Sequence, residues 1–279
     1  MIGLVTDSNA QLPPELAERY GVEIVPLTVT LDGTEYLEGV DLDADDFYAR
    51  FEAGRPTVST AQPSPGRFAA AYEAVAARGA REILSVHIGS SVSGTVNSAR
   101  LASQVSPVPV RIVDTGTASF AVSLCLWQAA EAVAAGATLQ EAAEAAERVG
   151  ATVGNVFVVG ALDVARAGGR LAGDLVPTTT IPVLTLAGGT MQQVERCHDF
   201  DQAAEAMAAY VCARGPSLRV GVGLSDRATM PLVSALEERL HDAPEVAKLV
   251  RYRIGPSVGA HTGPGTVGVM FAPTGRLEP

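Results

Sequence analysis

The stretch REILSVHIGSSVSGTVNSARLASQV, residues 81–105, runs from an apolar segment through a hydroxyl-rich turn into a helix-like segment. The apolar residues of 82–88 predict a buried strand, and residues 96–105 predict a helix. Between them, residues 89–99 place five serine or threonine residues around one internal glycine. Because unpaired backbone N–H groups and the helix dipole both point at the start of a helix, this turn is a candidate anion site.

The segments around this stretch alternate between strand-like and helix-like patterns in the first half of the chain. We expect strands at 2–6, 22–30 and 110–115, and helices at 13–21, 64–80 and 139–150. Apolar strands separated by helices predict a mostly parallel sheet that is covered on both faces.

After about residue 150 the pattern changes to strands joined by glycine-rich turns, with helices expected at 199–215 and 228–242. Strands arranged in this way favour antiparallel pairing. The sequence therefore predicts an α/β protein of two domains, an N-terminal, mostly parallel α/β sheet domain (residues 1–155) and a C-terminal α+β domain (residues 156–279). Clefts between domains are common ligand sites, so we expect a ligand buried at their interface.

The composition argues against several classes of function. The net charge of −11 opposes binding to nucleic acid or to an anionic membrane surface, since neither a basic cluster nor a polybasic run is visible. The cysteines follow no paired spacing, which favours a reducing compartment; they are Cys125, Cys197 and Cys212. The sequence has no signal-peptide pattern at its start and no run apolar enough for a bilayer span, so we expect a cytoplasmic protein without stable membrane insertion.

Metal sites are not expected. His87, His198 and His241 lie far apart in the sequence, without the spacing of metal ligands. The acidic segment 41–52 has Asp46 where a calcium loop needs glycine, and its second part is helix-like. Aspartates that cap a helix and complement its dipole explain this segment better.

The hydroxyl-rich segment has two interpretations that the residues alone leave open. Ser93 is either a ligand-binding residue or a helix N-cap, which would contribute on the order of 1 kcal/mol. A nucleotide-binding Walker loop is a poor match because Thr95 stands at the position of the lysine. The nucleophile elbow of serine hydrolases is also absent from this segment, because no G-x-S-x-G pattern occurs there.

Three further segments carry candidate polar groups. In 56–68 Thr60 could face a ligand, whereas Ser64 followed by a proline is explained as a helix start. The glycine-rich segment 255–269 surrounds His261, for which a functional role is slightly favoured over a structural one. Arg170, beside two glycines, is either solvated or directed at a carboxylate or phosphate.

Taken in order, several motifs resemble the DegV family of bacterial fatty-acid-binding proteins, which partner a fatty acid kinase. They span nearly the whole chain: VTDSNAQLPPEL (5–16), PTVSTAQPSPGRF (56–68), IGSSVSGTVNSA (88–99), ALDVARAGGRLAG (161–173), IPVLTLAGGTMQQVERC (181–197) and GPSVGAHTGPGTVGV (255–269). Three positions depart from the family pattern, since Ala61 and Gly89 replace serines and Val96 replaces a tyrosine.

The resemblance implies a long-chain fatty acid as ligand, buried with its carboxyl group near the domain interface, and no cofactor. By position, Thr60 and Ser93 would hydrogen-bond the carboxylate. His261, Arg170 and Arg196 would belong to a secondary polar network or face the kinase. The chain would bind the fatty acid and present it to the ATP-binding kinase for acyl-phosphate formation, without turnover of its own.

Two other functions stay open at this point. The first is an esterase or acyl-transfer enzyme with Ser93 as nucleophile and His261 as base, although no acid that would orient His261 is evident. The second is a regulator that binds a sugar or phosphate through the same hydroxyl groups. It would need polar walls instead of a long apolar tunnel.

Overall fold

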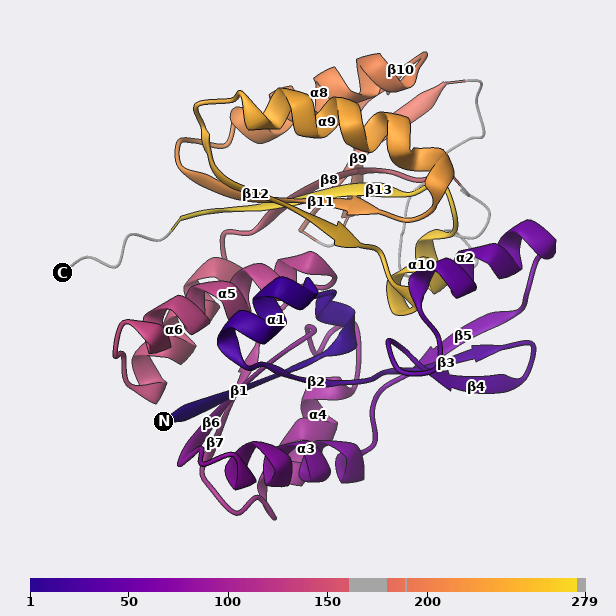
Figure 1. The fold of residues 1–279 in the computed structure, drawn as a ribbon. Coiled ribbons are helices and arrows are strands. Elements are labelled where there is room, and N and C mark those ends of the chain that lie inside the picture. Colours follow the sequence, from indigo (N-terminus) through magenta and orange to yellow (C-terminus); the bar gives the residue numbers. More distant parts are fainter. Residues whose placement is uncertain (161–179, 189, 275–279) are drawn as a thin grey trace. The chain divides into compact units, whose positions relative to one another are not determined.

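The computed structural model describes residues 1–160, 180–188 and 190–274 of the 279-residue chain. The contacts divide the chain into two compact units. The first unit is formed by Met1–Asp41 and Ser59–Val153, and the second by Leu42–Val58 and Gly154–Thr274. Figure 1 shows their elements along the chain.

The first unit is built on a four-stranded sheet in the order β2-β1-β6-β7, in which every neighbouring pair is parallel. The prediction of a parallel α/β sheet is therefore confirmed. The strands are β1 (Ile2–Asp7), β2 (Glu23–Val25), β6 (Glu82–His87) and β7 (Val110–Asp114). The helices are α1 (Pro14–Tyr20), α3 (Pro65–Ala77), α4 (Thr95–Ser103), α5 (Phe120–Ala134) and α6 (Leu139–Gly150).

Helices cover both faces of this sheet, with α3 and α4 on one side and α5 and α6 on the other (Figure 1). Alternation along β6 explains why both faces are apolar: Ile83 packs with the α3 and α4 side chains, and Leu84 points the opposite way. The apolar segment that becomes α5 is buried on nearly all sides and is a core helix. Among the described helices, none combines the length and apolar content needed to cross a bilayer.

The predicted strand 22–30 is two strands that belong to different sheets. The first part is β2, and the chain then leaves the parallel sheet at Pro26 to form β3 (Thr28–Leu31). Proline has no N–H to donate to a sheet ladder, which explains the break at this residue. A turn at Asp32–Gly33 leads to β4 (Thr34–Leu37), and β5 (Val58–Ala61) completes a small sheet in the order β4-β3-β5.

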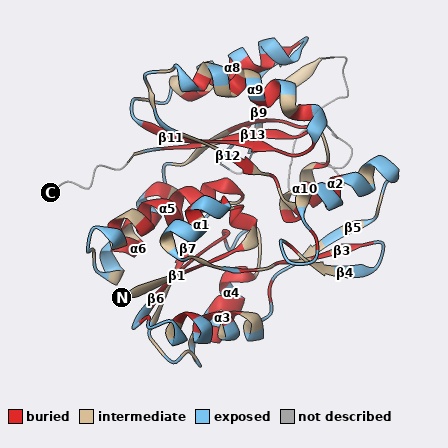
Figure 2. Cartoon of the chain, in the orientation of Figure 1, coloured by how far each residue is buried: buried red, intermediate tan, exposed pale blue. Residues whose placement is uncertain are grey.

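The second unit holds a six-stranded sheet in the order β10-β9-β8-β13-β11-β12. Its pairs are antiparallel except for the parallel pair of β11 and β12, so the antiparallel pattern predicted for this half is confirmed. Its elements are β8 (Gly154–Val158), β9 (Ile181–Ala187), β10 (Thr190–Cys197), α8 (Phe200–Cys212), β11 (Leu218–Leu224), α9 (Met230–His241), β12 (Val246–Arg253), α10 (Pro256–Thr262) and β13 (Val267–Pro273). Buried residues, red in Figure 2, dominate its central strands β11 and β13.

The acidic segment forms helix α2 (Ala44–Ala53), and Asp43 caps it by accepting a hydrogen bond from the Asp46 N–H at 2.8 Å. The helix interpretation of this segment is confirmed. Although α2 comes early in the sequence, it belongs to the second unit, whereas the predicted boundary at 155/156 assigned it to the first domain. Phe47 and Tyr48 of α2 lie so close to Gly259 that a Cβ there would come within 2.7 Å of both side chains.

Candidate functional site

The carboxyl ends of β1 and β6 mark the topological switch point of the parallel sheet. From β1 the chain continues outward to β2, whereas β6 and β7 extend the sheet in the other direction. Ligands of open α/β sheets bind outside the strand ends at such a point. The loop after β1 contains the 3₁₀ helix η1 (Ser8–Ala10), and the loop after β6 contains the hydroxyl-rich residues singled out above. We refer to residues 88–95 as the hydroxyl turn.

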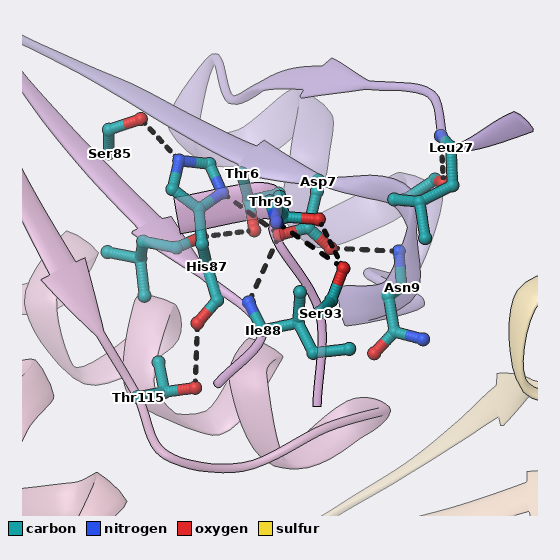
Figure 3. Close-up of polar contacts among 12 residues, drawn as sticks. Thr6, Asp7, Asn9, Leu27, Ser85, His87, Ile88, Ser93, Thr95 and Thr115 are labelled. Atoms are coloured by element: carbon teal, nitrogen blue, oxygen red, sulfur yellow. Dashed lines mark hydrogen bonds and ion pairs between the residues drawn. The ribbon is translucent and has the colours of Figure 1, made fainter. Parts of the chain in front are cut away.

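Three successive backbone N–H groups hold the start of the hydroxyl turn, and Figure 3 shows the first of them, from Ile88 to Asp7. The N–H of Ile88 donates to Asp7 Oδ2 at 3.1 Å, that of Gly89 to the carbonyl of Thr117 at 2.7 Å, and that of Ser90 to Asp114 Oδ1 at 3.0 Å. The turn is thus fixed by the last residues of β1 and β7 and by the loop after β7. These backbone groups are used within the protein, which leaves the side-chain hydroxyl groups as the natural ligand donors.

Asp114 is an acceptor for this turn in its ionised form. Burial opposes its ionisation, but hydrogen bonds from Ser90 and Gly116, together with the charge of Arg100, outweigh burial and lower the pKa of the Asp114 carboxyl. The carboxylate therefore stays charged at neutral pH. The stability that it adds is present at neutral pH and is lost as the pH falls through its lowered pKa.

The hydroxyl turn also depends on a close approach at Gly89. A Cβ at this position would lie 2.7 Å from the carbonyl carbon of Gly116 and 3.0 Å from the N atom of Thr117. Both neighbours are backbone atoms, so the loop after β7 would have to move. This contact explains why glycine fits at this position.

We expect Gly89→Ala to lower the free energy of unfolding by roughly 1–3 kcal/mol, because an inserted methyl group forces backbone shifts. Urea unfolding followed by circular dichroism measures the change. Gly66→Ala is the matched control, since a Cβ there meets its nearest atom, Ser64 Oγ, only at 3.8 Å within helix α3. Equal stabilities of the two variants would contradict the close approach.

Ser93 is not the N-cap of the helix that follows. Helix α4 begins at Thr95, its N-cap is Gly94, and this glycine offers no side-chain cap. Ser93 Oγ lies 2.9 Å from Thr95 Oγ1 and 3.4 Å from the Thr95 N atom, the second distance being long for a cap (Figure 3). The hydroxyl pair of Ser93 and Thr95 thus lies at the helix start, and Ser93 is half-buried.

Gln62 joins the segment after β5 to the hydroxyl turn. Its Nε2 donates to Ser98 Oγ on α4 at 3.0 Å, and its Oε1 would be only 1.9 Å from a Cβ at Gly94. Thr60 lies two residues before Gln62, and Ser93 lies one residue before Gly94. The structure therefore brings together the two segments that carry the predicted carboxylate ligands. Ser64 caps α3 and is followed by a proline, as predicted, with its Oγ 3.3 Å from the Arg67 N atom.

The loop after β7 is tied to the loop after β1 by Ser119. Its N–H donates to Asn9 Oδ1 at 2.9 Å, and its hydroxyl donates to Gln11 Oε1 at 3.0 Å. Ser119 has φ 61° and ψ −152°, a conformation that side-chain-bearing residues rarely adopt. Such strain persists where the surroundings hold the residue firmly, and it clusters at functional sites.

The remaining predicted site residues belong to the second unit or lie outside the described residues. His261 stands in the last turn of α10 and is half-buried. Arg196 is exposed on β10, where its Nε donates to Gln193 Oε1 at 2.9 Å. Arg170 and the segment 161–173 lie outside the described residues. The segment 255–269, expected as a loop between strands, forms the short helix α10 in its first half.

Asp226, which the sequence interpretation did not identify, supports the loop that follows α10. Its Oδ2 accepts hydrogen bonds from the Ser225 hydroxyl at 3.1 Å and from the Gly265 N–H at 2.5 Å. Gly265 in turn packs against Gly160, where a Cβ would come within 2.7 Å of its Cα. These contacts fix the glycine-rich loop at the C-terminal end of α10, next to His261.

Comparisons with known proteins agree with this architecture. The model of a family described as uncharacterised proteins of the DegV family matches residues 1–274. A DegV domain-containing protein of Streptomyces coelicolor is 36% identical over 276 residues, covering 97% of this chain and 98% of the relative. The structure of a fatty-acid-binding DegV family protein from Thermus thermophilus superposes with a TM-score of 0.86 at 32% identity, covering 98% of this chain and 99% of that one.

A second solved structure is that of DegV, a fatty acid binding protein from Bacillus subtilis. It superposes with a TM-score of 0.84 at 25% identity, over 97% of this chain and 98% of the other. The family match and the relative with more than a third of its residues identical both extend over nearly the whole chain. This chain therefore belongs to the DegV family.

Proposed function

We propose that this protein binds a long-chain fatty acid, with the carboxylate held at the hydroxyl turn. The observation that supports this most strongly is the near-complete overlap with the fatty-acid-binding DegV protein of Thermus thermophilus. The hydroxyl turn lies at the switch point of the parallel sheet, where α/β proteins bind their ligands.

The chemistry of the turn suits a carboxylate. A buried carboxylate is costly unless hydrogen-bond donors surround it, and Ser93 and Thr60 are half-buried hydroxyl donors on adjoining segments. Residues 88–99 contain hydroxyl groups and one asparagine but no lysine, arginine or histidine. Neutral donors hold the head group without a permanent positive charge, which leaves its oxygens able to react.

The acyl chain would supply most of the affinity. Each buried methylene contributes roughly 0.8 kcal/mol, so a sixteen-carbon chain that is only partly buried offsets the costs of ordering and of head-group desolvation. A short-chain carboxylic acid has the same head group and lacks this contribution. We therefore expect palmitate to bind and acetate to fail.

We further propose that the bound fatty acid is presented to a fatty acid kinase, which carries ATP and forms the acyl phosphate. In this scheme the protein needs no cofactor and performs no turnover alone. The hydroxyl of Ser93 is paired with Thr95 and not with a histidine, so its contacts do not support the activated nucleophile that an esterase needs. His261, Arg170 and Arg196 stay candidates for the polar network around the carboxyl group or for contact with the kinase.

Native mass spectrometry of the purified protein tests the ligand class directly. We expect a bound species in about one-to-one ratio, and organic extraction should identify it as a long-chain fatty acid. An empty protein that also refuses added palmitate would contradict fatty acid binding.

A second assay tests the kinase step. The protein, palmitate, ATP and a fatty acid kinase are mixed with hydroxylamine, which traps an acyl phosphate as the hydroxamate. We expect hydroxamate only when all components are present. Release of nitrophenol from a nitrophenyl ester by the protein alone, abolished in Ser93→Ala, would instead establish the esterase function.

A further inference from the structure

A chain of four buried polar side chains runs beneath the hydroxyl turn. Tyr72 Oη lies 3.0 Å from Ser85 Oγ, Ser85 Oγ lies 2.6 Å from His87 Nε2, and His87 Nδ1 lies 2.9 Å from Asp7 Oδ2. All four side chains are fully buried. Figure 3 shows the last three members converging on the end of β1.

One assignment of the protons gives every hydrogen in this hydrogen-bond network an acceptor. Burial raises the pKa of Tyr72 to about 12, although its hydrogen bond with Ser85 lowers it in part, so the tyrosine keeps its proton. In this assignment Tyr72 donates to Ser85 Oγ. Ser85 then donates to His87 Nε2, and the proton on His87 Nδ1 faces the Asp7 carboxylate. That proton is donated to Asp7 Oδ2, and each hydrogen in the chain has an acceptor.

The order Ser85, His87 and Asp7 matches that of a hydrolase triad, but its geometry does not serve catalysis. The Ser85 hydroxyl is fully buried and already bonded to Tyr72, so no substrate reaches it. The hydrogen-bond network acts on the orientation of the Asp7 carboxylate instead. Asp7 Oδ1 accepts the Asn9 N–H at 3.1 Å, and Asp7 Oδ2 accepts the Ile88 N–H at 3.1 Å.

Asp7 thereby joins the loop after β1 to the first residue of the hydroxyl turn, across 81 positions of sequence. We propose that Asp7 and His87 are positioning residues, which hold the hydroxyl turn and thus Ser93 in place for the head group of the ligand. This inference rests on the proposed fatty acid binding for its ligand, and on the hydrogen bonds above for the positioning itself. His87 directs the Asp7 carboxylate, and the carboxylate anchors the Ile88 N–H.

Two substitutions of His87 separate positioning from packing. In His87→Asn the side-chain amide N occupies about the place of Nδ1 and keeps a donor for Asp7. In His87→Gln the amide N reaches toward the place of Nε2, so Asp7 loses this donor. Both variants lose the imidazole ring, so a purely structural role predicts equal effects. Palmitate affinity and hydrogen exchange of residues 84–95 are measured for both, at a temperature at which both are folded.

We expect His87→Gln to bind palmitate about tenfold or more weakly and to exchange the hydroxyl-turn amides faster, because a hydrogen bond to a charged group is lost. His87→Asn should stay within about threefold of the wild type in affinity. Equal losses in the two variants, or none in either, would overturn the proposal. If the wild type itself binds no palmitate, the proposed function fails, while the exchange rates of the ligand-free variants still decide whether His87 positions the turn.

A measurement on the wild type covers the case in which neither variant folds. In the ¹⁵N spectrum of histidine-labelled protein, His87 should show a slowly exchanging proton on Nδ1. A proton on Nε2 alone would leave Asp7 without its imidazole donor and would overturn the proposal.

Discussion

The double variant Thr60→Val and Ser93→Ala should bind palmitate at least a hundredfold more weakly than the wild type. Each hydroxyl that donates to a charged group contributes roughly 1.5–3 kcal/mol, so two of them correspond to a loss of about 10²–10⁴-fold if both contact the carboxylate. Valine has nearly the shape of threonine, so the half-buried position of Thr60 on β5 keeps its packing. Isothermal titration with palmitate measures the affinity.

Ser91→Ala is the matched control for this variant. Ser91 is exposed in the same turn, two residues before Ser93, so removing its hydroxyl should leave the affinity unchanged. The free energy of unfolding is measured in parallel, because Ser93 does not cap α4 and its removal should hardly change stability. A melted Ser93→Ala protein, or one that binds palmitate like the wild type, would contradict the role of Ser93 as a ligand residue.

Local patterns predicted most of the elements around the site. Ser64 followed by proline marked the start of α3, and the apolar run 82–88 marked β6, because caps and burial act within a few residues. The predicted strand 22–30 was wrong as one strand. The residues on both sides of Pro26 are strand-like, so only the missing N–H of this proline indicates that the chain changes sheets.

The contacts that hold the site could not be predicted from local sequence patterns. The Asp7 carboxylate accepts hydrogen bonds from His87 and Ile88, about 80 residues away, and no spacing rule links such positions. Gln62 was part of a recognised motif, but its contact with Gly94 depends on how the segment after β5 meets the start of α4. The assignment of α2 to the second unit depends on the packing of Phe47 and Tyr48 against Gly259, which likewise leaves no local signal.

Truncation of Phe68 should have the largest effect on stability. Its side chain is fully buried among Val5, Tyr72 and Ile83, and its ring meets that of His87 edge to face at 5.0 Å between centroids. We expect Phe68→Ala to lower the free energy of unfolding by about 3–5 kcal/mol, through lost apolar burial and the cavity that remains. Urea unfolding is followed by the fluorescence of Trp127, the only tryptophan of the chain, which is buried in α5 of the first unit.

Phe68→Leu serves as the control, since leucine refills most of the space and should cost far less. A loss below about 1 kcal/mol in Phe68→Ala would mean that the neighbours collapse into the cavity, because the cost depends on how well a site relaxes.

The stabilisation of the Phe68→Ala protein by added palmitate measures whether the cavity also disturbs the ligand site. A ligand that binds only the folded state stabilises it by about 2.7 kcal/mol at a hundredfold excess over its Kd. Because the cavity lies against the ring of His87, we expect palmitate at a fixed concentration to stabilise Phe68→Ala less than the wild type. An equal increment would show that the hydroxyl turn keeps its shape when the core beneath His87 is opened, and would separate the stability of the first unit from the affinity of its site.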